Sequence, residues 1–469
     1  MLNFISRVLA NLVSLAIFFV VIPALAILVV VAVLIVGLSG DQGQKMITPK
    51  DGVLVYDMSR GISEFKNSSD GLARLFSSSR AMSTYDLCMR LATAAKNKNI
   101  KAVLIYGSFD SASDYPSSAQ VAELRNALLE YRQSGGKVTA YLENPSQLDY
   151  YLASCADNII MNPFGEFTFR GLSLQMPFVG DAMKKYGVDV QVIKAGAHKS
   201  FGEMFTSAKM SDFDKTRMRA VIDSLWTNIL AEISASRKIP TGTLERIVDT
   251  DAVFSARKAK ELKLVDSLMY YDEVVEKMRK DYGEDGESFP QIPVARLSEV
   301  RAPSADEIAV VYMRSEIVES GKVSEFTSSE VYVPLLRSLR TDDFVKAVVL
   351  RIDSGGGSAY ASEAIRREVE LLAKKKPVIA SFGGVAASGA YWIATAANKI
   401  IATPQTITGS IGVFSLAFSG QKFAGDWGVT FDGVKTSKFS DIGTLTRPMT
   451  EPEIAKMKVM VDDIYDAFI

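Results

Sequence analysis

The first pattern along the chain is an alternation of short apolar runs with longer amphipathic runs. The short runs are rich in valine, isoleucine and leucine, which is typical of strands buried on both faces of a parallel sheet, and the longer runs have the period of a helix. The predicted strands are 52–56, 102–106, 137–142 and 159–161, and the predicted helices are 87–96, 120–133, 147–155 and 212–239. This alternation predicts an α/β fold with parallel strands.

A much longer apolar segment precedes these elements. Residues 12–38 are broken only by one serine, one proline and one glycine, and no Ala-x-Ala cleavage site follows them. As a helix the segment would be roughly 40 Å long, more than the ~30 Å hydrocarbon core of a bilayer. We therefore predict an uncleaved transmembrane anchor at 12–38, with a helix buried in the core as the alternative. Arg7 before it and Asp41 after it favour residues 1–11 inside the cell and the rest of the chain outside.

The second part of the chain repeats the first. Lys101–Ile105 is echoed by Lys346–Leu350. Tyr150–Pro163 is echoed by Tyr391–Pro404, and for this longer match the offset is 404 − 163 = 241 positions. Matches of this length predict a duplicated α/β domain.

The repeat sets the expected domain boundaries. The first domain is expected at 46–280 and the second at 307–469. Residues 281–306 between them are polar, contain three prolines and lack periodicity, so they are expected to form a linker. The first domain continues for about 50 residues beyond the point that corresponds to residue 469, so the second domain is expected to be truncated at its C-terminus.

The stretch Gly383–Gly389 contains a serine, Ser388, among glycines, alanines and one valine. An apolar run at 377–382 leads into it, and a helical run at 390–398 leaves it. A serine at such a strand–turn–helix junction is unshielded and has free backbone N–H groups nearby, which suits a nucleophile beside an oxyanion hole. A turn capped by a serine is the alternative. The stretch is not the Gly-x-Ser-x-Gly motif of α/β-hydrolases.

The two copies of the repeat differ at this point. The position 241 residues before Ser388 is Gln147, so the first copy lacks the small-residue junction. The position 241 residues after Lys199 is Ser440, so the second copy lacks a lysine at that register. The first copy therefore has a lysine and no serine site, and the second copy has the serine site and no lysine at that register.

Composition excludes several classes of function. The net charge is −1 and no basic tract occurs, so no nucleic-acid partner is expected. The two cysteines have no metal-ligand spacing, and the single histidine, His198, leaves no room for a histidine-rich zinc site. We expect no metal and no cofactor. A Ser-His-Asp triad would need His198 as its base, so a hydrolase with this composition points to another base.

The chain resembles the long, duplicated form of the signal peptide peptidase A family, also called protease IV. The motifs that carry this resemblance are Gly384–Trp392, Thr408–Val413, Arg351–Ser358 and Gly196–Ser200. The resemblance implies tandem crotonase-like (ClpP-like) domains and a membrane-anchored serine peptidase that degrades released signal peptides with a Ser-Lys dyad. It implies Ser388 as nucleophile, Lys199 as general base, and a homotetramer at the bacterial inner membrane with its catalytic part on the periplasmic or outer side.

The remaining site residues follow from what amide hydrolysis requires. A free lysine is protonated at neutral pH, so we expect Lys199 to be buried between the two halves, where loss of water lowers its pKa. Gly356 and Gly389 are expected oxyanion donors, because glycine lets backbone N–H groups approach a bound carbonyl. Ser410 is expected to orient the lysine or, alternatively, to satisfy a turn. His198 is the alternative base.

Two other functions remain open from the residues. A crotonase-type enzyme that acts on acyl thioesters would share the fold and the oxyanion hole, and a catalytically silent membrane scaffold would share the anchor. The nucleophile and the anchor favour a peptidase that cleaves apolar peptides.

Overall fold

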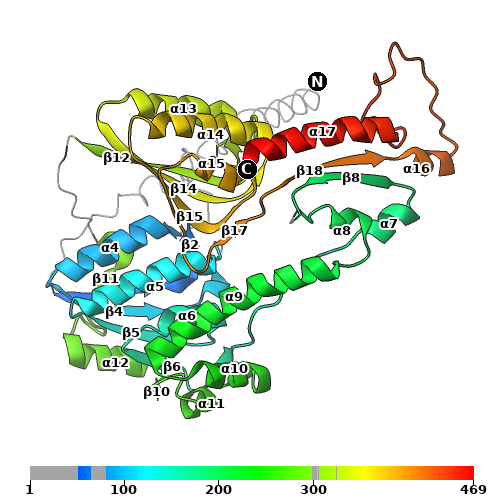
Figure 1. Ribbon diagram of the computed structural model, residues 1–469. Coiled ribbons are helices and arrows are strands. Elements are labelled where there is room, and N and C mark those ends of the chain that lie inside the picture. The colour runs from blue at the N-terminus through cyan, green and yellow to red at the C-terminus, as the bar shows by residue number, and fades with distance from the viewer. Residues whose placement is uncertain are drawn as a thin grey trace, which may run out of the picture.

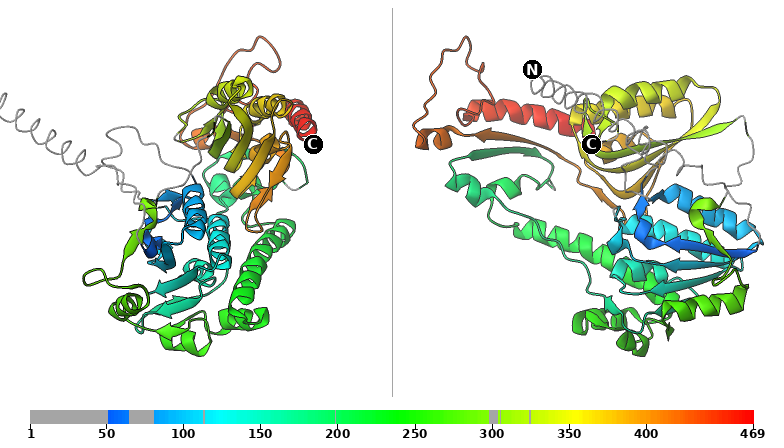
Figure 2. Two further views of the ribbon diagram at one scale, coloured as in Figure 1. Left: turned by 90° about the vertical axis from the view of Figure 1, so that its left-hand side faces the viewer. Right: turned by 180° about the vertical axis from the view of Figure 1, so that it is seen from behind.

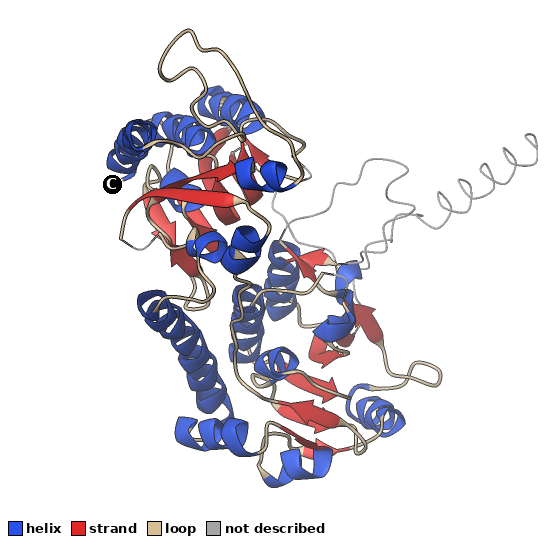
Figure 3. Ribbon diagram, turned by 90° about the vertical axis from the view of Figure 1, so that its right-hand side faces the viewer, coloured by secondary structure: helices blue, strands red, loops and turns tan. Residues whose placement is uncertain are grey.

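The computed structural model describes residues 51–64, 81–112, 114–197, 199–297, 304, 306–323 and 325–469. The described chain forms two α/β halves, coloured blue to green and yellow to red in Figure 1. Each half has a parallel sheet flanked by helices, as Figure 3 shows by secondary structure. The prediction of an α/β fold with parallel strands is confirmed.

The first half contains a six-stranded parallel sheet in the order β10-β6-β5-β4-β1-β11. Its strands are β1 (Gly52–Asp57), β4 (Ile100–Tyr106), β5 (Lys137–Leu142), β6 (Asn158–Met161), β10 (Ser267–Leu268) and β11 (Gln291–Pro293). The four residues 102–105 of the central strand β4 are completely buried. A strand covered on both faces needs such a continuous apolar run, which explains why the sequence predicted it well.

Helices cover both faces of this sheet. They are α4 (Thr84–Lys96), α5 (Ser118–Gln133), α6 (Gln147–Ala153), α9 (Asp212–Arg237), α10 (Thr241–Thr250), α11 (Ala256–Glu261) and α12 (Tyr271–Tyr282). Val274 and Met278 of α12 pack on one face of the sheet. The other six helices contribute to the core on the opposite face. Serine caps fix where several helices begin; Ser117, for example, forms a reciprocal capping box with Gln120 at the start of α5.

The second half contains a parallel sheet in the order β13-β12-β14-β15-β16, with β17 also paired to β15. Its strands are β12 (Glu307–Val318), β13 (Thr327–Ser328), β14 (Val345–Gly357), β15 (Val378–Ala387), β16 (Lys399–Ile401) and β17 (Ile407–Gly409). Its helices are α13 (Ser329–Thr341), α14 (Ala359–Ala373), α15 (Gly389–Ala394), α16 (Gln421–Asp426) and α17 (Glu451–Phe468). The apolar core lies between the sheet and helices α13, α14 and α15.

The remaining elements are short or project from the two sheets. They are β2 (Ile62–Ser63), β3 (Met82–Ser83), β7 (Glu166–Thr168), α7 (Gly180–Lys185), β8 (Asp189–Ala195), α8 (Glu203–Thr206), β9 (Val253–Ser255) and β18 (Val413–Ser419). Strands β2 and β3 pair in parallel, and β7 and β9 pair antiparallel.

The duplication is visible in the topology. The order β6-β5-β4-β1 in the first sheet corresponds to β16-β15-β14-β12 in the second. Helices α7 and α16 are separated by 421 − 180 = 241 positions, and strands β7 and β17 by 407 − 166 = 241 positions. The repeat found in the sequence is therefore a repeat of structure, and its register holds outside the matching motifs.

Each half contributes one strand to a two-stranded arm, formed by β8 and β18, on the side of the molecule where Ser388 lies. Strand β8 of the first half pairs antiparallel with β18 of the second, with Ala195 opposite Val413 and Asp189 opposite Ser419. Figures 1 and 2 show this pair extending away from both sheets, with α9 connecting the arm of the first half to its sheet. The sequence did not predict this pairing, because β8 and β18 do not correspond to each other in the repeat.

A buried charge cluster also joins the halves. Arg351, on β14, donates hydrogen bonds to Glu64 and Glu123 of the first half, and its guanidinium also reaches Ser381 Oγ (3.1 Å) and the Phe382 carbonyl oxygen (3.2 Å). Burial raises the pKa of Glu64 to about 7, although the charge of Arg351 opposes the shift. The arginine is therefore the group that allows the Glu64 carboxylate to be buried close to the partly exposed carboxylate of Glu123.

The predicted linker, 281–306, needs correction. Its first residues end α12, and β11 (Gln291–Pro293) pairs with β1 at the edge of the first sheet. Phe289, Ile292 and Leu297 are buried in the first half. The first domain therefore extends to residue 297 at least. This strand could not be predicted from the sequence, because a strand of three residues that contains a proline shows no periodicity.

No helix among the described residues combines the length and apolar character that a bilayer span requires. The predicted anchor, 12–38, lies outside the described residues.

Candidate active site

Ser388 lies at the junction between β15 and α15, as the sequence predicted. Its backbone has φ 54° and ψ −123°, a region that residues other than glycine rarely occupy. Its N–H donates to the Gly409 carbonyl oxygen (2.9 Å), and its own carbonyl accepts from the Trp392 N–H (2.9 Å). Strained backbone of this kind persists only where the surroundings fix it, and it turns the hydroxyl out of the sheet edge.

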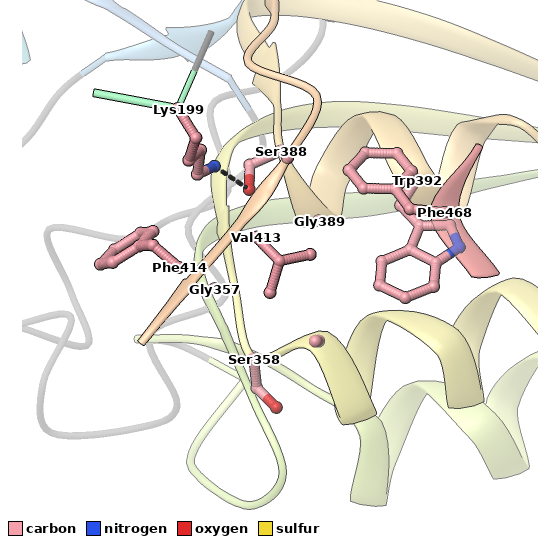
Figure 4. Close-up of a pocket in the computed structure, with 11 residues that line it drawn as sticks. Lys199, Gly357, Ser358, Ser388, Gly389, Trp392, Val413, Phe414 and Phe468 are labelled. Carbon is pink, nitrogen blue, oxygen red and sulfur yellow. Dashed lines mark hydrogen bonds between the residues drawn. The ribbon is translucent and has the colours of Figure 1, made fainter. Parts of the chain in front are cut away.

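Lys199 comes from the other half, four residues after β8 ends at Ala195. Its Nζ donates to Ser388 Oγ at 2.8 Å, to the Ser410 carbonyl oxygen at 3.2 Å and to Ser410 Oγ at 3.3 Å. Figure 4 shows the lysine and the serine pointing toward each other across the pocket. The structure therefore brings together three of the residues that the sequence singled out.

The pairing of β8 with β18 explains this contact. Ala195 and Val413 are opposite each other, so the loops that follow β8 and precede β18 cross at Gly196 and Gly412. A Cβ atom at Gly412, where φ is +151°, would lie 2.8 Å from the Ala195 carbonyl oxygen and 3.0 Å from Lys199 Cβ. Only glycine lets the backbones approach this closely.

The surroundings of the amine favour its neutral form. Lys199 is 5% exposed, and its burial lowers its pKa from 10.5 to about 8. No carboxylate in the described part of the chain forms an ion pair with it, whereas the Phe414 ring lies 5.6 Å from Nζ. The expectation of a lysine buried between the halves is met.

The oxyanion donors need a change from the sequence prediction. The Gly356 N–H already donates to Ser354 Oγ at 3.1 Å, so it is not free for a substrate. Gly357 lines the pocket together with Ser388 and Gly389. Gly389 is the first residue of α15, so its N–H has no acceptor within the helix. Gly357 is therefore a better candidate than Gly356, and Gly389 remains one.

Gly356 has a packing role instead. Its φ is +98°, and a Cβ there would lie 2.6 Å from the Gly389 nitrogen and 2.8 Å from Ser388 Cβ. The loop thus passes directly beneath the serine.

The pocket around the dyad has a volume of about 220 Å³, and apolar side chains stand on two sides of its polar centre. Val413 and Phe414 form one side, and the other side is Trp392, which stacks on Phe468 with ring centroids 4.8 Å apart (Figure 4). These wall residues were not predicted from the sequence. The spacing of Trp392, four residues after Ser388 and so one turn along α15, was the available signal. The walls favour an uncharged, apolar group beside the serine.

Two other expectations concerned a metal site and His198. The described residues contain no cluster of histidine, cysteine or acidic side chains that could hold a metal ion. His198, the alternative base, lies outside the described residues.

Comparison of the sequence with known proteins identifies the family of this chain. The sequence profile of peptidase family S49 matches residues 130–284 and 370–469, segments that contain Lys199 and Ser388. The chain belongs to peptidase family S49. The profile of the Clp protease family matches residues 301–408, which covers most of the second sheet.

Individual relatives agree with this assignment. Protease 4 of Salmonella typhi is 33% identical over 399 residues, which cover 82% of this chain and 64% of that protein. Protease 4 of Haemophilus influenzae is 31% identical, over 83% of this chain and 65% of that protein. The chloroplastic serine protease SPPA of Arabidopsis thaliana is 30% identical, over 74% and 53%. The chain spans less than two thirds of the length of these S49 relatives.

Proposed function

We propose that this S49 protein is a serine endopeptidase that hydrolyses apolar peptides with a Ser-Lys dyad. The observation that carries the proposal is the 2.8 Å contact between Lys199 Nζ and Ser388 Oγ, made by an amine whose pKa is lowered to about 8. A serine hydroxyl becomes an effective nucleophile when a neutral base within hydrogen-bonding distance accepts its proton.

The geometry supports the following sequence of steps. Lys199 takes the proton of Ser388 as Oγ attacks the peptide carbonyl, and the N–H groups of Gly357 and Gly389 stabilise the oxyanion. Lys199 then gives the proton to the leaving amine, which departs and leaves an ester on Ser388. A water molecule, activated by the same lysine, hydrolyses that ester and restores the serine.

Covalent labelling tests the proposal directly. A fluorophosphonate should add to Ser388 and to no other serine, as mass spectrometry of the tryptic peptide would show. A fluorogenic apolar peptide should be hydrolysed by the same preparation and not after labelling. If the reagent leaves Ser388 unmodified while the protein is folded, the nucleophile has been assigned wrongly.

The rate should depend on the protonation of Lys199. A lysine with a pKa near 8 is about one-tenth neutral at pH 7, whereas an ordinary lysine is neutral in fewer than one molecule in about 10³. We expect kcat/KM for the peptide to rise with pH and to level off above a midpoint near 8. A profile that is flat from pH 6 to pH 10 (roughly the range in which such a base titrates) would contradict a lysine base.

Ser410 is proposed to position the amine, since both its carbonyl and its hydroxyl oxygen accept from Nζ. Ser410→Ala removes one of these contacts, so Lys199 is held less well against Ser388. We expect kcat to fall by about 10- to 100-fold with little change in KM. Ser415→Ala on β18 is the matched control and should leave both constants unchanged. Equal kcat values in the two variants would show that the hydroxyl of Ser410 serves only its turn.

Released signal peptides are the proposed natural substrates. The apolar pocket walls support an apolar substrate, and the S49 assignment supports a peptidase. Residues 12–38 are proposed to anchor the protein in the bacterial inner membrane, with the catalytic part on the periplasmic or outer side. Fractionation of cells, followed by protease treatment of intact spheroplasts, tests the anchor and the orientation together.

A closed homo-oligomer, proposed to be a tetramer, is supported by the arms. The counterparts of β18 and β8 in the repeat are 172–178 and 430–436, and neither belongs to a strand. Phe431 and Val434 in the second segment are exposed. Antiparallel pairing of 172–178 in one copy with 430–436 in the next would repeat the β8–β18 contact and form a head-to-tail ring. Light scattering would measure the number of copies.

The runner-up is an acyl-thioester enzyme of the crotonase type. It would use the oxyanion site without a covalent serine, so it would turn over acyl thioesters after Ser388→Ala. The third hypothesis, a catalytically inactive membrane scaffold, predicts neither labelling of Ser388 by a fluorophosphonate nor turnover of a peptide or an acyl thioester.

A further inference from the structure

A second cavity, of about 450 Å³, lies between the two halves and is lined by residues of α5 and α6 on one side and of β15 and β17 on the other. Figure 1 shows where these elements lie in the two halves. It occupies the position in the first half that the active-site pocket occupies in the second. Seven residues of the active-site pocket have their counterparts 241 positions earlier in this cavity: 357–359, 388, 389, 392 and 413 correspond to 116–118, 147, 148, 151 and 172. The duplication has therefore kept the pocket in both copies.

The chemistry of the second cavity differs from that of the first. Gln147 stands where the nucleophile would be, and its side-chain oxygen accepts from the Gly171 N–H at 3.0 Å. Pro116 replaces Gly357 and has no N–H to stabilise an oxyanion. No lysine is among the described residues that line the cavity. The cavity can bind a molecule but lacks the groups for acyl transfer.

One side chain in the cavity has unused hydrogen-bonding capacity. Gln405 is 1% exposed, and neither its side-chain nitrogen nor its side-chain oxygen has a hydrogen-bond partner among the described residues. The Tyr151 hydroxyl is close enough to be influenced by this amide, but it donates to Glu232 at 2.7 Å. A buried amide without partners is costly, and such groups in native proteins call for an explanation.

The backbone of Gln405 is fixed independently of its side chain. Its N–H donates to Thr403 Oγ1 at 3.3 Å, and the Thr406 hydroxyl in the same turn donates to the Gly383 carbonyl oxygen at 2.9 Å. The turn is thereby held against β15, so Gln405 has a rigid support in the wall of the cavity.

The walls around this amide are mostly apolar. Leu148, Tyr151 and Ile229 are buried on the side of the first half, and Val385 and Ile407 come from the second half. Gln405 offers one donor and one acceptor side by side, which is the complement of a peptide group with its C=O and N–H. The other amide and the carboxylate in the lining, those of Gln147 and Asp353, already accept from the Gly171 and Val385 N–H groups. A mostly apolar pocket with one unused amide suits an apolar peptide segment better than an anionic ligand.

We propose that this cavity is a non-catalytic binding site for an apolar peptide, in which Gln405 pairs with a backbone amide of the peptide. The inference rests on the proposed function in one respect: the bound segment is part of a long substrate whose other part is cleaved at Ser388. The first copy of the domain then retains the peptide while the second copy hydrolyses it.

Binding to a protein that cannot cleave tests the site without relying on catalysis. The full chain with Ser388→Ala is titrated with a fluorescent, N-acetylated oligopeptide of leucine and alanine, and anisotropy is measured. Leu172→Trp fills the cavity from its partly exposed rim. Leu174→Trp is the matched control, because it is similarly exposed, does not line the cavity and lies in the same segment, 172–178, so any effect on the proposed pairing with the next copy is common to both variants. We expect Leu172→Trp to weaken binding about tenfold and Leu174→Trp to have no effect.

A second variant tests the role of the amide. Gln405→Leu keeps a similar volume and removes both unpaired groups, so it should raise thermal stability and still weaken peptide binding. In the active protein, Leu172→Trp should raise KM for a long apolar peptide about tenfold with kcat unchanged, and leave cleavage of a short peptide unaffected.

The outcomes separate the two proposals. Equal peptide affinity in Leu172→Trp and Leu174→Trp, or no binding by the Ser388→Ala protein, overturns the second site. If binding is lost with Leu172→Trp but Ser388 is never labelled by a fluorophosphonate, the site stands and the peptidase proposal falls.

Discussion

Lys199→Met is expected to lower kcat/KM for an apolar peptide by about 10³-fold or more. Methionine fills nearly the same space but cannot accept the proton of Ser388, whose Oγ lies 2.8 Å from Nζ. A positioned general base contributes typically 10²–10⁴-fold, and residues that act as a unit lose nearly all of their effect together. Initial rates for Lys199→Met, Ser388→Ala and the double variant would measure this, and the double variant should be no slower than Ser388→Ala. A residual rate above about one-tenth of wild type would exclude the lysine as base.

The same substitution is expected to stabilise the fold. The pKa of Lys199 is lowered from 10.5 to about 8, so between these pH values the unfolded chain holds a proton that the folded chain has released. The stability of the wild type therefore rises with pH across this window, and below pH 8 the buried charge destabilises the fold in full. Methionine removes that penalty. The melting temperature of Lys199→Met should exceed that of wild type most clearly below pH 8, and the difference should shrink toward pH 10.5.

Arg351→Met is expected to destabilise the protein by about 3–5 kcal/mol, because it leaves the buried carboxylate of Glu64, and the partly exposed carboxylate of Glu123 beside it, without a counter-charge. Urea denaturation at neutral pH measures the loss. The pKa of Glu64 is raised to about 7, above its unfolded value of 4.5, so its carboxylate destabilises the fold as pH rises through this range. Without the arginine the shift increases, and the loss should be smaller at pH 5 than at pH 8.

Two controls make this result specific. Arg219→Met removes an exposed arginine that pairs with Asp223 on the surface of α9, and such a pair contributes at most about 1 kcal/mol. Glu64→Gln added to Arg351→Met removes one uncompensated carboxylate and should recover part of the stability. If Arg351→Met behaves like Arg219→Met, the cluster does not hold the halves together.

The strands and helices of the first sheet were predictable because their signal is local. Strand β5 spans Lys137–Leu142 in the structure, as the apolar run predicted, and helix α5 begins two residues before its predicted start. A strand buried on both faces must be apolar throughout, so a continuous apolar run in the sequence predicts it. Strand β11 (Gln291–Pro293) failed for the opposite reason. Three residues at a sheet edge carry too little pattern, and only their partner β1 defines them as a strand.

The site was predictable as residue types and not as geometry. Ser388 and Lys199 stood out because the two copies of the repeat differ at these positions and because both lie in motifs that resemble those of the signal peptide peptidase A family. The sequence analysis expected Gly356 as an oxyanion donor, but the structure shows its N–H donating to Ser354 Oγ, because the direction of a backbone N–H depends on φ and on the acceptor it already has. The apolar walls were missed because Phe468 reaches Trp392 only through the placement of α17.

The sequence by itself determined the duplicated α/β architecture, the uneven repeat that leaves a serine site in one copy and a lysine in the other, and the absence of a histidine-rich site. These follow from periodicity, repetition and composition, which are properties of the chain read in order. Only the tertiary structure decided that the two groups meet. They are 189 positions apart and on non-equivalent parts of the repeat, and the pairing of β8 with β18 joins them. Strand pairing across that distance depends on the packing of both halves at once, and burial of the amine, which sets its pKa, is a consequence of the same contact.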